Sequence, residues 1–125
     1  MGRMLITALL AAAAATAAAG AAAAEPLDAR IDCTPAGGGP VYDCVIALVE
    51  PGTGAPVPDA RFTVRADMPL MPMAHNIRPV DAVPAGPPGS YRARLELDMH
   101  GTWAVMLRIV EPVQAEIGRR IDFFE

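Results

Sequence analysis

The stretch YRARLELD, residues 91–98, alternates apolar and charged side chains with a period of two. In an extended chain, its four apolar residues fall on one side and its four charged residues on the other. Alternation of this kind is typical of a β-strand that has one buried face and one face in water. The stretch therefore predicts an antiparallel sheet that packs one face against a core.

The same alternation recurs along the chain, and no segment after Ala24 has the spacing of an amphipathic helix. Groups of glycine and proline separate the alternating segments and mark turns. The predicted strands lie at residues 28–34, 41–49, 60–66, 76–83, 90–97, 102–110 and 116–124. Seven short strands in about a hundred residues predict an all-β fold, an immunoglobulin-like antiparallel β-sandwich. Pro79 confines the fourth of these strands to a sheet edge or a bulge.

Residues 1–24 have the pattern of a signal peptide that precedes this sandwich. Arg3 gives a positive start, an apolar run follows from Met4, and Ala22 and Ala24 form an A-x-A cleavage site. We therefore expect residues 25–125 to form a single secreted domain. If the apolar run stayed uncleaved, it would be long enough to anchor the chain in a membrane.

Charge excludes one class of partner. After residue 24, nine arginines stand against fourteen carboxylates, with no lysine, so the net charge is −5 with both histidines neutral. An acidic domain without a basic cluster lacks the electrostatic footprint of a nucleic-acid-binding protein. We therefore expect no nucleic-acid partner.

The two cysteines, Cys33 and Cys44, flank the glycine-rich loop TPAGGGP, residues 34–40. If the chain forms a hairpin here, the cysteines face each other across it. In an oxidising compartment this arrangement favours a disulfide, which typically adds about 2 to 4 kcal/mol of stability. A thiolate pair that binds a metal is the alternative.

Methionine and histidine are concentrated in two predicted connections, DMPLMPMAH at residues 67–75 and DMHG at residues 98–101. Connections between successive antiparallel strands alternate between the two ends of a sandwich, so the first, third and fifth connections share one end. We therefore expect the two stretches to meet beside the glycine-rich loop. The candidate metal ligands are Met68, Met71, Met73, His75, Met99 and His100.

The residue types in these stretches indicate copper. Thioether sulfur is a soft ligand and imidazole an intermediate one, and this mixture selects monovalent copper over magnesium or calcium. Pro69 and Pro72 favour extended backbone at the residues before them. We therefore expect Met71, Met73 and His75 to share one face as primary ligands. The other candidates would complete or gate the site.

Two other interpretations fit the same residues. Methionine commonly fills irregular gaps, so the stretches could simply cap the open end of the sandwich. Alternatively, Asp67 and Asp98 together with the two histidines could bind zinc or divalent copper. The number of methionines favours the softer ion.

The chain resembles the YtkA-like and FixH-like domains of bacterial envelope proteins. The resemblance is carried by Asp67-Met68-Pro69, Met73, His75, Gly89, Tyr91, Leu95, Gly101 and Trp103, and it covers residues 62–109. It implies an immunoglobulin-like sandwich in the periplasm with a role in copper handling or in the maturation of copper-dependent oxidases. It assigns Met68, Met73 and His75 to the site. The chain departs from the family pattern at Ala74, where such domains often have glycine, and FixH-like proteins keep a membrane anchor.

Together these observations predict a periplasmic copper-binding protein that acts as a Cu(I) chaperone or sequesters Cu(I). Its expected partner is an envelope protein that donates or accepts copper. The chain has no HExxH motif, no GxSxG motif and no catalytic-looking cysteine–histidine pair, so we expect no enzyme. The alternative is an assembly or interaction module without a metal. In IDFFE, residues 121–125, the adjacent phenylalanines would point to opposite faces of a strand and leave one exposed.

Overall fold

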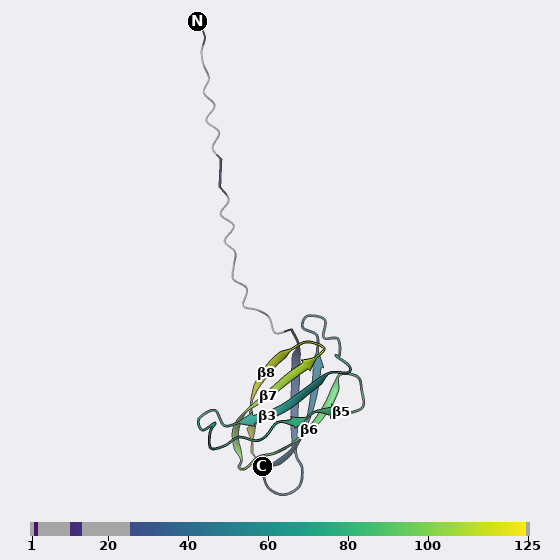
Figure 1. Cartoon of the computed structure of the whole chain (residues 1–125), viewed down its shortest axis with the longest axis vertical. Helices are drawn as coiled ribbons and strands as arrows, with labels where there is room; N and C mark the ends of the chain where they lie inside the picture. The colour runs from purple at the N-terminus through teal and green to yellow at the C-terminus, as the bar shows by residue number, and fades with distance from the viewer. Residues whose placement is uncertain (1, 3–10, 14–25, 125) are drawn as a thin grey trace.

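The computed structural model describes residues 2, 11–13 and 26–124. Within residues 26–124 it has eight strands: β1 (Asp28–Pro35), β2 (Val41–Val49), β3 (Arg61–Asp67), β4 (Val80–Asp81), β5 (Val83–Pro84), β6 (Ser90–Glu96), β7 (Gly101–Glu111) and β8 (Ala115–Phe123). Every strand pairing is antiparallel. The strands form two four-stranded sheets, ordered β1-β2-β6-β5 and β4-β3-β7-β8 (Figure 1).

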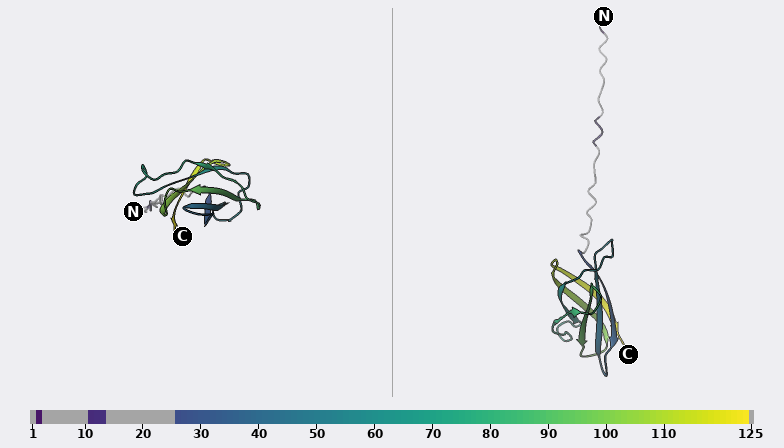
Figure 2. Two further views of the ribbon diagram at one scale, coloured as in Figure 1. Left: turned by 90° about the horizontal axis from the view of Figure 1, so that it is seen from below. Right: turned by 90° about the vertical axis from the view of Figure 1, so that its right-hand side faces the viewer.

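The two sheets are the layers of a β-sandwich. In the left view of Figure 2, the blue strands of one sheet lie below the teal and yellow strands of the other. The strand orders are those of a constant-type immunoglobulin domain with one extra edge strand beside β3. The predicted immunoglobulin-like sandwich is therefore confirmed.

The core lies between the layers and is made by alternate residues of the long strands. In β6, Tyr91, Ala93 and Leu95 are buried, while the charged residues between them are exposed. Trp103 in β7 is fully buried, so its indole lies within this core. The alternation that predicted a sheet thus also identifies which face packs inward.

The predicted strand at residues 76–83 was wrong as a single element. The chain here forms two strands of two residues each, and they belong to different sheets: β4 pairs with β3, and β5 pairs with β6. Both are edge strands, and Pro79, which cannot donate to a ladder, lies just before β4. The segment crosses from one layer to the other, and a continuous strand cannot pair in both.

The disulfide between Cys33 and Cys44 is present, so that prediction is confirmed. The cysteines are direct cross-strand partners in the β1–β2 hairpin, as their placement around the glycine-rich loop predicted. Both sulfurs are therefore bonded, and the alternative of a thiolate pair that binds a metal is excluded in this state.

Three connections meet at one end of the sandwich, which we call the loop end: residues 36–40, 68–79 and 97–100. The backbone N–H of Leu97 donates to the carbonyl of Pro40 at 2.9 Å, which joins the third connection to the first. The side chains of His75 and Asp98 join it to the second. The predicted convergence of the connections is confirmed, and Figure 1 shows the blue and teal loops at this end.

The expected signal peptide, residues 1–24, lies almost entirely outside the described residues. Within the part of the chain that the structure does describe, we find no helix with the length and hydrophobicity needed to cross a bilayer.

Candidate metal centre

The loop after β3 is folded into two consecutive turns. Met71 N–H donates to the Met68 carbonyl at 3.0 Å, and Ala74 N–H donates to the Met71 carbonyl at 3.2 Å. Pro69 and Pro72 each occupy the second position of a turn, where the fixed φ of proline is favourable. The stretch as a whole is therefore not extended, and the alternation that would have placed Met71, Met73 and His75 on one face does not apply.

Hydrogen bonds close the base of this loop. Met68 N–H donates to the His75 carbonyl at 2.9 Å, so the two ends of segment 68–75 are held together. The side-chain amide of Asn76 donates to the Pro72 carbonyl at 2.9 Å. Compact loops whose ends are close often carry function. The arrangement fixes where His75 leaves the loop.

His75 is held by Asp98 from the β6–β7 connection. Its Nδ1 lies 2.8 Å from Asp98 Oδ2, and the two side chains are 27% and 49% exposed. An ionised carboxylate only accepts hydrogen bonds, so Nδ1 must carry the proton. In the neutral imidazole, Nε2 then has a free lone pair. Metal-binding histidines commonly donate their second ring nitrogen to a carboxylate in this way.

Sequence reasoning did not foresee this role of Asp98. The sequence suggested Asp98 only as an oxygen ligand of zinc or divalent copper, together with Asp67 and the two histidines. Among the residues that the structure describes, no three carboxylate, histidine or cysteine side chains gather as a possible metal group. The sequence feature that could have predicted the contact between His75 and Asp98 is the strand topology, which brings the DMHG turn to the loop after β3.

Met68 and Met71 lie on a pocket at the side of the loop. The pocket has a volume of about 420 Å³ and is lined by Met68, Pro69, Leu70, Met71, Thr102 and Arg120. Met68 also packs against the start of β7, because a Cβ atom on Gly101 would lie 2.8 Å from its Cε. Glycine at this position lets the thioether reach the sheet.

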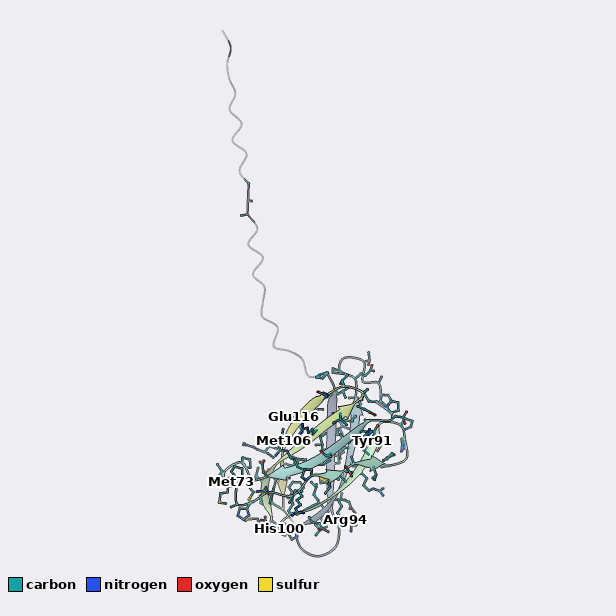
Figure 3. The ribbon with its side chains drawn as sticks, in the orientation of Figure 1. Met73, Tyr91, Arg94, His100, Met106 and Glu116 are labelled. Carbon is teal, nitrogen blue, oxygen red and sulfur yellow. A yellow bond between two sulfur atoms is a disulfide. The ribbon has the colours of Figure 1, made fainter. Side chains whose placement is uncertain are left out.

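Met73 and Met99 are open to solvent. Met73 is 93% exposed and Met99 is 40% exposed. In Figure 3, Met73 lies on the loop that projects at the left, apart from His100 and from Met106 on β7. These thioethers are accessible to an ion or a partner from outside.

His100 packs against the aromatic core. Its ring meets the buried ring of Tyr42 edge to face, with the centroids 6.2 Å apart. The backbone next to it is also fixed, because the buried indole of Trp103 donates to the Met99 carbonyl at 3.2 Å. These two contacts hold Met99 and His100 against the core, and they thereby help to position the neighbouring Asp98.

The six candidate ligands thus share the loop end, in separate groups. Met68 and Met71 share a pocket, His75 is oriented by Asp98, and Met73 stands at the loop surface. The loop end carries an imidazole nitrogen and several thioethers, which are ligand types that suit a soft ion, and no hydrogen bond joins His75 to a methionine side chain among the described residues.

A comparison with protein families found one match. The model of a family described as YtkA-like matches residues 21–108, which include the loop after β3 and the DMHG turn. Comparison with curated proteins found no match. Comparison with solved structures also found none.

Proposed function

Because this chain belongs to the YtkA-like family, we propose that it is a periplasmic copper-binding protein that holds Cu(I) at the loop end of its sandwich. In this proposal it serves as a chaperone or sequestering protein for an envelope donor or acceptor of copper. Met71, Met73 and His75 are the primary ligands. Met68, Met99 and His100 complete or gate the site.

The observation that carries the proposal is the hydrogen bond between His75 Nδ1 and Asp98 Oδ2 at 2.8 Å. It directs the free Nε2 lone pair away from Asp98 and raises the basicity of the ring as a ligand. Methionines precede His75 in its own loop and follow Asp98 in the other. A neutral imidazole with neutral thioethers suits a soft monovalent ion and needs no thiol deprotonation.

Exposure of the thioethers supports a transfer role over permanent storage. Met73, at 93% exposure, would remain reachable while His75 is held from behind by Asp98. A ligand on a surface loop can exchange an ion with a partner without opening the core. In this proposal His75 is the ligand whose position is fixed, and the methionines are the ligands that a partner can replace.

The test is a titration with Cu(I) against a competing chelator, using protein expressed from the full-length sequence. We expect one equivalent to bind. The double variant Met73→Leu, His75→Ala should lose binding while its far-UV circular dichroism is unchanged. Met106→Leu is the matched control, because Met106 lies on the body of β7 (Figure 3), and it should bind like the wild type. Stoichiometric copper in the double variant would contradict the proposal.

A second candidate function is an interaction module without a metal, for an envelope partner such as one in oxidase maturation. It is favoured by the end of the chain, where Phe123 is buried and Phe124 is 62% exposed. A pull-down from envelope extracts with wild type and Phe124→Ser tests it. Partners lost only in the variant would favour this function, and an unchanged set of partners would count against it.

A further inference from the structure

The pocket beside the loop after β3 contains residues that the copper proposal does not use, namely Pro69, Leu70, Thr102 and Arg120. Of its lining residues, Met68, Pro69, Leu70 and Met71 are apolar, and Arg120 from β8 is the one charged side chain. Leu70 is 94% exposed, which is unusual for a large aliphatic side chain. An exposed apolar surface with a polar rim is typical of an interaction site.

The position of Arg120 explains why its charge is available. Its cross-strand partner on β7 is Ala104, and β8 is an edge strand with no neighbour on its other side. Asp122, two residues further along the same face of β8, accepts a hydrogen bond from Thr102. Within the described part of the chain, Arg120 forms no hydrogen bond or ion pair. An unpaired guanidinium offers two parallel donors to a carboxylate.

We propose that this pocket docks an extended segment of a partner protein in which an apolar side chain stands next to a carboxylate. The apolar side chain enters between Met68 and Met71, whose flexible thioethers adapt to its shape. The carboxylate meets Arg120. This inference goes beyond copper binding and does not depend on it.

The net charge of the whole protein makes Arg120 the source of any attraction for an acidic segment. The chain carries a net charge of −4, so its overall field repels an acidic segment. Attraction must therefore come from Arg120 itself. For the same reason, removal of this one charge should be decisive, whereas removal of a distant arginine should not.

The form of the pocket favours a protein segment over a small molecule. The pocket is open to solvent, and one of its lining residues, Leu70, is almost fully exposed. Small-molecule sites bury most of their ligand. A peptide chain, in contrast, can lie along the loop and insert a single side chain, as in other groove-bound peptides.

The test uses copper-free protein expressed from the full-length sequence, labelled with 15N, and a capped six-residue peptide of alternating glutamate and leucine. We expect concentration-dependent shifts of the amide signals of residues 68–71, Thr102 and Arg120. A peptide with glutamine in place of glutamate should bind about tenfold more weakly, because the charged partner is lost. Equal binding of the two peptides would overturn the proposal.

Two charge-matched variants complete the test. Arg120→Glu should weaken binding of the glutamate peptide by about tenfold or more, because like charges then face each other. Arg92→Glu changes the net charge equally but lies on β6 in the other sheet, so it should bind like the wild type. Wild-type binding by Arg120→Glu, shifts at another face, or equal losses in both variants would overturn the proposal. A copper titration of Arg120→Glu reports separately on the metal site.

Discussion

Replacement of Asp98 by asparagine should weaken copper binding strongly while it leaves the fold almost unchanged. The substitution keeps the shape of the side chain but removes the charge that requires His75 Nδ1 to carry the proton. An amide can donate as well as accept, so the imidazole is no longer restricted to the tautomer that leaves Nε2 free.

The size of the change in copper affinity and in folding stability follows from the hydrogen bond between His75 and Asp98. Loss of a carboxylate behind a metal-binding histidine typically costs about 10- to 100-fold in affinity, or about 1.4 to 2.7 kcal/mol. The effect on folding should be below about 1 kcal/mol, because the side chains of His75 and Asp98 are 27% and 49% exposed and surface ion pairs contribute little.

The assay compares Cu(I) affinity, from competition with a chelator, with the free energy of unfolding in urea. Asp43→Asn is the matched control: it removes an aspartate of similar exposure that pairs with Arg94 on the outer face of the other sheet. Asp43→Asn should keep wild-type copper affinity. If Asp98→Asn also kept it, or if both variants lost affinity equally, the reasoning about His75 would be refuted.

Three further predictions concern the fold. The Cys33→Ala, Cys44→Ala variant should lose about 3 kcal/mol of stability, since the disulfide closes a loop with a sequence separation of 11; a urea-unfolding loss below about 1 kcal/mol would contradict this estimate of chain entropy. Trp103→Phe should lower the free energy of unfolding by about 2 to 4 kcal/mol, because a fully buried indole and its hydrogen bond are lost. Thermal unfolding measures this, and an unchanged stability would show that the core repacks freely around the smaller ring. The hydrogen bond from Arg94 and its charge hold the pKa of Asp43 below its ordinary value. Since the folded-state pKa is lowered, this pair stabilises the protein above the unfolded-state pKa, and that contribution is lost as pH falls below about 4. Arg94→Gln should therefore flatten the loss of stability in that range, and parallel pH profiles for the variant and wild type would count against the pair.

Most of the fold could be predicted because period-two alternation reports directly on which residues face the core. The stretch at residues 91–98 shows this best: its apolar set is the buried set, and its charged set is the exposed set. The segment around Pro79 could not be predicted in the same way. It pairs with both sheets in turn, and an alternation pattern does not report a change of partner.

At the candidate site, sequence predicted the meeting of the loops but not their internal shape. Antiparallel connectivity alone brings His75 towards the DMHG turn. Proline, however, suits both extended backbone and the second position of a turn, and the hydrogen bonds at Met68 and Met71 select the turn. The role of Asp98 depends on a side-chain distance, which no spacing in the sequence specifies.

The most direct measurement is the X-ray absorption spectrum of the complex with one equivalent of Cu(I). We predict a monovalent copper edge, with scattering from both thioether sulfur and an imidazole nitrogen. The His75→Ala complex should lose the imidazole contribution, whereas Met106→Leu should leave the spectrum unchanged. A first shell without sulfur, or an imidazole contribution that survives in His75→Ala, would contradict a Met/His copper site at the loop end.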